Sequence, residues 1–151
     1  MPLGSMCLPS LRWILRCHNL EDDENTRFLL REYILSAWSV AHEFSRFLDA
    51  SQPRAVVIFN GQFFPEAVAG HLARRRGLRV ITHEVGMRPA SAFFTEGEAT
   101  AYPIRMPEGF ELSTAQDARL DAHLEQRFQG RFSMAGIQFW PSMRPLDEAF
   151  L

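Results

Sequence analysis

Apolar and polar positions follow their clearest pattern between Arg54 and Gly86, where they predict a strand followed by a helix. Ala55–Phe59 is a short apolar run rich in β-branched residues, which is typical of a buried strand. Pro65 suits the first position of a helix, and apolar residues recur at helical spacing as far as Arg76. The strand should therefore lead directly into an amphipathic helix.

A second strand should follow this helix. Gly77 stands where helices commonly end, and Leu78–Thr82 is again apolar and β-branched. The helix and the strand would span roughly 18 Å and 16 Å, so one can run back along the other. This pattern predicts a right-handed crossover between two parallel strands, and hence an α/β fold with a mostly parallel sheet.

A longer apolar repeat predicts a helix over Asn25–Leu48. Glu21–Glu24 immediately precede it. Paired acids occur in metal-assisted nucleotide-sugar sites, but negative charge at a helix start is stabilised by the helix dipole, and we prefer that interpretation. The apolar stripe of the helix recurs at three- and four-residue steps and comprises Leu30, Ile34, Ala37, Trp38, Ala41, Phe44 and Leu48.

A capping-box pattern near the C-terminal end predicts one more helix. Ser113 is followed three residues later by Gln116, and the helix should run to about Gln129, before Gly130. Its expected buried row consists of Leu120, Leu124 and Phe128.

The remaining segments have weaker patterns. Leu11–Leu15 fits a strand or a helical turn, and Ser91–Thr95 with Ala99–Tyr102 fits a hairpin or two short extended segments. Phe132–Trp140 is apolar without a clear period, and Pro145–Leu151 begins like a helix. Residues 1–5, ahead of a second methionine, resemble a cloning remnant, so we expect one α/β domain over residues 6–151.

Composition narrows the class of protein. The chain has 151 residues with 46% hydrophobic and 23% charged content, as globular domains do. Its net charge of −2 implies no nucleic-acid or anionic-membrane partner. All 16 basic residues are arginine, which fits a GC-rich genome and excludes a Walker lysine, a Schiff-base lysine and a lysine general base.

The cysteines and the apolar runs indicate in which cellular compartment the protein is expected. Cys7 and Cys17 form no C-x-x-C pair, and the sequence shows neither a signal peptide nor an apolar run long enough for a transmembrane segment. We therefore expect a reduced, cytoplasmic protein.

The predicted crossover places chemistry-bearing residues at one edge of the sheet. Parallel strands have their carboxyl ends at the same edge, and the helix amino end, with free N–H groups, opens there too. Open α/β sheets bind ligands at this edge. The candidate pocket consists of Asn60, Gly61, Thr82, His83, Glu84 and Gly86.

His83 and Glu84 are the candidate catalytic pair. A neutral histidine is a natural general base, and a nearby carboxylate can orient it. Successive strand residues point to opposite faces, however, so one of the two could pack while the other bonds loop amides. No zincin or G-x-S-x-G motif is present, the other histidines lack ligand spacing, and we expect no metal and no cofactor.

Two further features concern ligand contact. Gly61 would let a ligand approach backbone N–H groups, although the turn lacks a dinucleotide fingerprint. Phe93–Phe94 and Phe139–Trp140 could stack on a sugar, but such residues more often belong to a core or an interface. Phe94 is retained as a candidate substrate contact.

Asn60–Glu66, Val80–Gly86 and Phe93–Gly97 together resemble bacterial glycosyltransferases built from two Rossmann domains, the GT-B type. They are most similar to enzymes of capsule and surface polysaccharide synthesis, over about Leu11 to the end. The resemblance implies a Rossmann-like three-layer sandwich, as a partial domain on the N-terminal, acceptor side. It also implies that His83 or Glu84 acts as base.

The resemblance further implies a nucleotide-sugar donor and a carbohydrate acceptor. The second domain of such enzymes is missing here, so we expect the chain alone to be inactive. Uncovered apolar surface should then favour a homodimer or a larger assembly. Two alternatives remain open: a non-catalytic α/β binding or interaction module, and a small nucleotide-binding protein of flavodoxin-like build.

Overall fold

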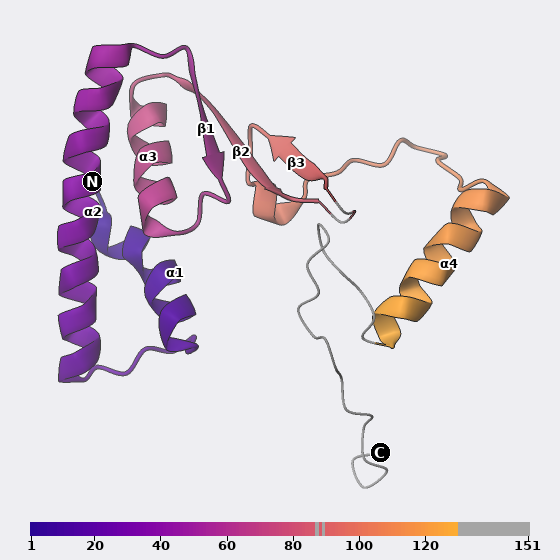
Figure 1. Cartoon of the computed structure of the whole chain (residues 1–151), viewed down its shortest axis with the longest axis horizontal. Coiled ribbons are helices and arrows are strands. Elements are labelled where there is room, and N and C mark those ends of the chain that lie inside the picture. Colours follow the sequence, from indigo (N-terminus) through magenta and orange to yellow (C-terminus); the bar gives the residue numbers. More distant parts are fainter. Residues whose placement is uncertain (87, 89, 130–151) are drawn as a thin grey trace, which may run out of the picture. The chain divides into compact units, whose positions relative to one another are not determined.

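The computed structural model describes residues 1–86, 88 and 90–129 and divides the chain into two compact units. Unit 1 comprises Met1–Glu84 and Phe94–Pro103, and unit 2 comprises Val85–Phe93 and the chain from Ile104 onward. The elements are α1 (Leu3–Leu15), α2 (Glu24–Ser51), β1 (Ala55–Phe59), α3 (Phe64–Arg75), β2 (Arg79–Val85), β3 (Ala92–Thr95), a 3₁₀ turn η1 (Ala99–Ala101) and α4 (Thr114–Phe128) (Figure 1). The fold is mixed α/β with a small three-stranded sheet in the order β1-β2-β3.

The predicted strand–helix–strand crossover between two parallel strands is confirmed. β1 and β2 pair in parallel, with a register that runs from Ala55 opposite Arg79 to Phe59 opposite His83. Gly77 follows α3 with a φ of +70°, the left-handed conformation that glycine adopts at helix ends.

The second strand differs from the prediction in its limits. It begins at Arg79 and continues through Val85, so His83 and Glu84 lie inside β2 and not beyond it. Exposed or partly exposed residues alternate with buried ones along its whole length, as in a pleated strand with one covered face.

Three helices of unit 1 pack together beside the sheet. α1 and α2 both contact α3, and α3 contacts β1, so α3 lies between the other helices and the strands (Figure 1). The core among the helices contains Cys7, Ala37, Ala41 and Val68. A second cluster joins α3 to the sheet through Ile58, Ala73 and Val80.

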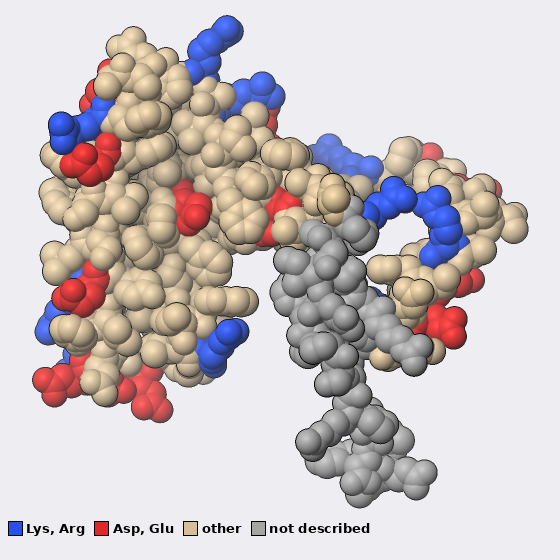
Figure 2. All heavy atoms as spheres, in the orientation of Figure 1, with Lys and Arg blue, Asp and Glu red and all other residues tan. Residues whose placement is uncertain are grey.

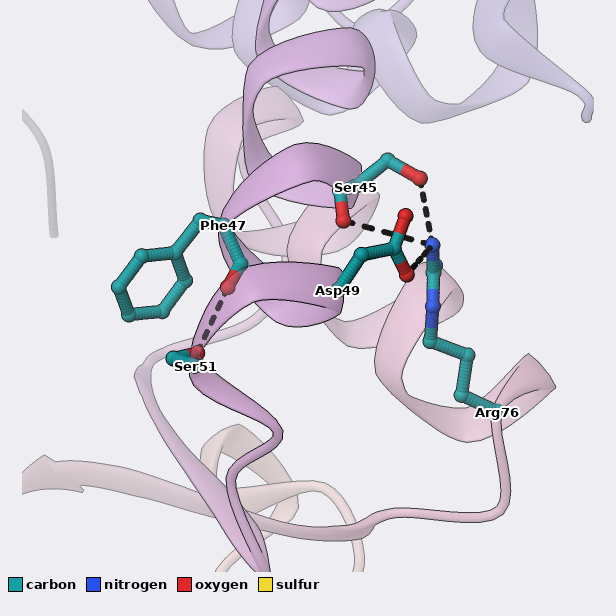
Figure 3. A network of polar contacts seen from close by, with 5 residues as sticks. All are labelled: Ser45, Phe47, Asp49, Ser51 and Arg76. Atoms are coloured by element: carbon teal, nitrogen blue, oxygen red, sulfur yellow. Dashed lines mark hydrogen bonds and ion pairs between the residues drawn. The ribbon is translucent and has the colours of Figure 1, made fainter.

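The ends of α2 follow local chemistry. Asp23 caps its start by accepting a hydrogen bond from the Thr26 backbone N–H at 2.7 Å, which agrees with the preferred interpretation of the acidic run. Near its other end, Arg76 Nη2 bonds Asp49 Oδ1 at 2.9 Å and also contacts Ser45, and so ties α3 to α2 (Figure 3).

One expectation for the helices of unit 1 needs correction, and one open alternative is decided in favour of a helix. Trp38 was placed in the buried stripe of α2 but is 62% exposed, because it lies about 100° around the helix from buried Ala37. Leu11–Leu15 is the end of a helix that begins at Leu3, and Leu3 packs against the core.

The Rossmann-like three-layer sandwich is not confirmed. Among the described residues, α3 is the helix that packs against a strand, and it covers the face that carries Ile58 and Val80. Side chains of the other face are open to solvent: Val57 is 58% exposed, Phe59 45% and Phe94 58%. Parallel sheets usually have both faces covered, so this open face is unusual.

The remaining expectations concern the later part of the chain. The capping box of Ser113 and Gln116 is confirmed, but Leu120, Leu124 and Phe128 are exposed. The repeat predicted which positions share a face of α4, but it carried no information on whether another part of the chain covers that face. Ala99–Ala101 is a 3₁₀ turn and not an extended segment. The predictions for Gly130, for Phe132–Trp140 with its Phe139–Trp140 pair, and for Pro145–Leu151 lie outside the described residues.

Candidate functional site

The turn after β1 has an unusual backbone. Asn60 and Gly61 both have positive φ, of 59° and 84°. Asparagine and glycine are the residues that adopt this conformation most readily. The Asn60 N–H donates to the His83 carbonyl at 2.7 Å, and the Gln62 N–H donates to Asn60 Oδ1 at 3.0 Å. The predicted strand-to-helix turn is therefore confirmed, and it holds the Asn60 side chain in one orientation.

The Asn60 side chain joins the ends of the two parallel strands. Its Nδ2 donates to Glu84 Oε2 at 2.6 Å, across 24 residues of sequence. Glu84 is only 8% exposed, and such a buried carboxylate requires hydrogen-bond donors. Nearby, burial and then the negative charge of Glu84 raise the pKa of the Tyr102 phenol above its ordinary value. Asn60 and Glu84 thus form the polar centre of this edge.

Thr82 has a structural role at the same edge. Its hydroxyl donates to the Gly97 carbonyl at 2.8 Å and accepts from the Ala99 N–H at 3.0 Å. Thr82 is 2% exposed and Ala99 is fully buried, so these bonds hold η1 against the sheet. The hydroxyl proposed for substrate contact is therefore already engaged within the fold.

His83 points to the opposite face from Thr82 and Glu84. Its imidazole lies between the rings of Phe59 and Phe94, with both centroid distances 5.2 Å. The alternating burial along β2 places Glu84 on the covered face and His83 on the open one. The structure therefore separates the two candidate catalytic residues, and joins Phe94 to His83.

Gly86 belongs to unit 2, and glycine is required at this position by a close contact within the chain. Its N–H donates to the Ser91 carbonyl at 2.9 Å, and a Cβ at this position would overlap the Ser91 side chain. Glycine is needed here because another part of the chain approaches its backbone closely. This role does not depend on a ligand.

The amino end of α3 is less available than the sequence suggested. The Phe64 N–H donates to the Ser10 hydroxyl of α1 at 2.9 Å, and the next residue, Pro65, has no N–H. Of the backbone N–H groups expected to face a ligand, the one of Phe64 is therefore already bonded, and Pro65 has none. Ser10 caps α3 from a distant part of the sequence, and no sequence pattern predicted this cap. No sequence pattern predicted the position of Tyr102 near Glu84 either.

Two features are absent from the described residues: a cluster of metal-ligating side chains and a membrane-spanning helix. No group of three or more His, Cys, Asp or Glu side chains there is arranged to hold a metal ion. Within the same residues, no helix is both long enough and apolar enough to cross a membrane.

Comparison of the chain with protein-family models, with curated proteins and with solved structures finds no match.

Proposed function

We propose that this chain is the acceptor-side α/β unit of a nucleotide-sugar-dependent glycosyltransferase. The observation that supports this most is the 2.6 Å bond from Asn60 to Glu84. It places an oriented carboxylate at the adjoining carboxyl ends of β1 and β2, the edge at which open α/β sheets bind ligands.

In this proposal Glu84 is the base. It accepts the proton of an acceptor hydroxyl while that oxygen attacks the anomeric carbon of the donor. The bond from that carbon to the nucleotide diphosphate breaks, and the leaving group keeps the electron pair. Asn60 positions the carboxylate, and a second domain, as in the enzymes that this chain resembles, holds the donor.

The test compares the two sequence candidates. In the complete natural protein, Glu84→Gln should lower the transfer rate by roughly 10²–10⁴, the usual scale for a general base. His83→Phe should retain most of the activity, because His83 packs between two phenyl rings on the other face. Equal rates for Glu84→Gln and the parent would remove Glu84 from the mechanism, and a loss confined to His83→Phe would reverse the assignment.

A second candidate function is a non-catalytic interaction module. The open face of the sheet favours it, since Val57, Phe59 and Phe94 are each more than two-fifths exposed. Contiguous exposed apolar patches are found at protein–protein contact surfaces. An interaction module would bind a protein through this face and would not bind nucleotide-sugars.

A further inference from the structure

A hollow of about 340 Å³ lies beside the start of α3, within unit 1. Small-molecule sites are typically concave, mostly apolar and about 300–1,000 Å³ in volume, with a few polar groups that fix orientation. The hollow falls within this volume range and its wall is mostly aromatic and aliphatic, but it is shallow and open to solvent. Its principal lining residues are Trp13, Ile14, Tyr33, Phe63, Phe64 and Glu66.

The aromatic walls are held in place by contacts with one another. Trp13 and Phe63 meet edge to face, with centroids 5.8 Å apart and planes at 62°. Tyr33 and Phe64 meet in the same way at 5.3 Å and 70°. Trp13 is nevertheless 60% exposed, so the paired rings still present aromatic surface to solvent. The hollow is therefore formed before any ligand arrives.

Two charged side chains bear on what can bind: Arg16, which contacts the Trp13 ring, and Glu66, which lines the hollow. The Arg16 guanidinium lies 4.9 Å from the centre of the Trp13 ring, so a positive charge already uses that ring. Glu66, in the first turn of α3, supplies a carboxylate that can accept hydrogen bonds. A second cation would be repelled by Arg16, and a wholly apolar ligand would cover polar groups without bonding them. A neutral ring with one apolar face and several hydroxyls suits both features.

We propose that this hollow binds one pyranose ring of the acceptor glycan. The C–H face of the sugar packs on Trp13 and Phe63, and its hydroxyls donate to Glu66. The inference rests on the proposed function, because a glycan is the acceptor of that reaction. The chain order supports the link, since Phe63 follows directly after the Asn60–Gln62 turn that orients Glu84.

The test measures sugar binding with no donor present. Saturation-transfer NMR on the described chain would use cellobiose, maltose, lactose and chitobiose as probes. Trp13→Leu and Glu66→Gln should each weaken binding by roughly tenfold, from the lost ring contact and the lost charge-assisted bond. Trp38→Leu and Glu43→Gln are matched controls, because both residues are exposed on α2 and away from the hollow. All four variants should keep the parental urea midpoint.

Three results would overturn the subsite. They are no binding of any probe by the parent, equal losses in the controls, and binding of tetramethylammonium in preference to the sugars. The proposed function fails separately. If a complete protein binds sugar through Trp13 but transfers none, the proposed transferase activity is wrong and the proposed sugar subsite stands. If the Trp13 and Glu66 variants transfer sugar at the parental rate, only the proposed subsite is wrong.

Discussion

At the scale of single residues, Asn60 shows how one side chain can serve both the fold and the site. Its amide oxygen closes the turn and its amide nitrogen holds Glu84. Its backbone also needs a residue that tolerates a φ of 59°. Asparagine meets all three requirements of this strand-to-helix turn.

Asn60→Gly removes the side chain but allows the same positive φ, so it measures the contribution of the side chain to stability separately from that of the backbone conformation. Loss of a hydrogen bond to a buried charged group should lower the free energy of unfolding by about 1–3 kcal/mol. Urea unfolding would measure this, with Asn25→Gly near the start of α2 as a control for the general cost of glycine. A loss no larger than a few tenths of a kcal/mol would mean that the bond to Glu84 carries little stability.

The burial of the His71 Nε2 atom predicts that the stability of the fold depends on pH. Its Nε2 is buried without a hydrogen-bond partner in the described structure, and burial, followed by the charge of Arg75, lowers its pKa below the ordinary 6.5. The unfolded chain therefore binds more protons than the folded chain just below that pH, so stability should fall as the pH drops through about 6.5.

The measurement compares urea midpoints at pH 7.5 and pH 5.5. The parent should lose more stability between the two than His71→Gln, which does not titrate. His42→Gln on the exposed side of α2 should behave like the parent. The same acid loss in all three proteins would assign the effect to other groups.

At the scale of elements, contacts between helices depend on a few residues distant in sequence. Ser10 of α1 caps α3, and Arg76, directly after α3, bonds the end of α2 (Figure 3). These bonds orient α3, the helix that packs against the sheet. The placement of the Asn60 turn therefore depends partly on side chains outside the crossover.

Arg76→Met keeps the apolar stem of the side chain and removes the guanidinium. The Arg76 side chain is 30% exposed, so its bonds to Asp49 and Ser45 are screened only in part. We expect a loss of about 0.5–1 kcal/mol, which should shrink at high salt. Arg75→Met is the neighbouring control. If both variants unfold at the same urea concentration, the contact drawn in Figure 3 does not stabilise the helix pair.

At the scale of the whole molecule, uncovered apolar surface is the main feature. Unit 1 leaves one face of its sheet open, and β1 is an edge strand in the order β1-β2-β3. Figure 2 shows the charged side chains of unit 1 mostly around the margin of the face drawn, with broad uncharged areas between them. Surfaces of this kind favour association.

We expect the chain to be a homodimer or larger at micromolar concentration, as light scattering would show. A Phe59→Ser, Phe94→Ser double variant should shift it toward monomer if the open face is the interface, whereas Phe28→Ser, Phe47→Ser on exposed positions of α2 should not. A parent of 17.3 kDa in solution would show that the open face does not pair with itself. If the proposed transferase needs a second domain to hold its donor, the same preparation should show no transferase activity.

The sequence by itself determined features that arise between near neighbours in the chain. The two strands and the helix of the crossover, the acidic start of α2, the capping box at Ser113 and the glycine turn at Gly77 were all predictable. Each depends on periodicity or on hydrogen bonds between residues a few positions apart, and such interactions form in any context that allows the element.

Only the tertiary structure decided which residues meet across the fold. It put Glu84 on the covered face of β2 and His83 on the open one, engaged the Thr82 hydroxyl with η1 and used Ser10 to cap α3. It also left the apolar row of α4 exposed. Periodicity states which positions share a face, but it carries no information on which element covers that face, because that depends on contacts between residues tens of positions apart.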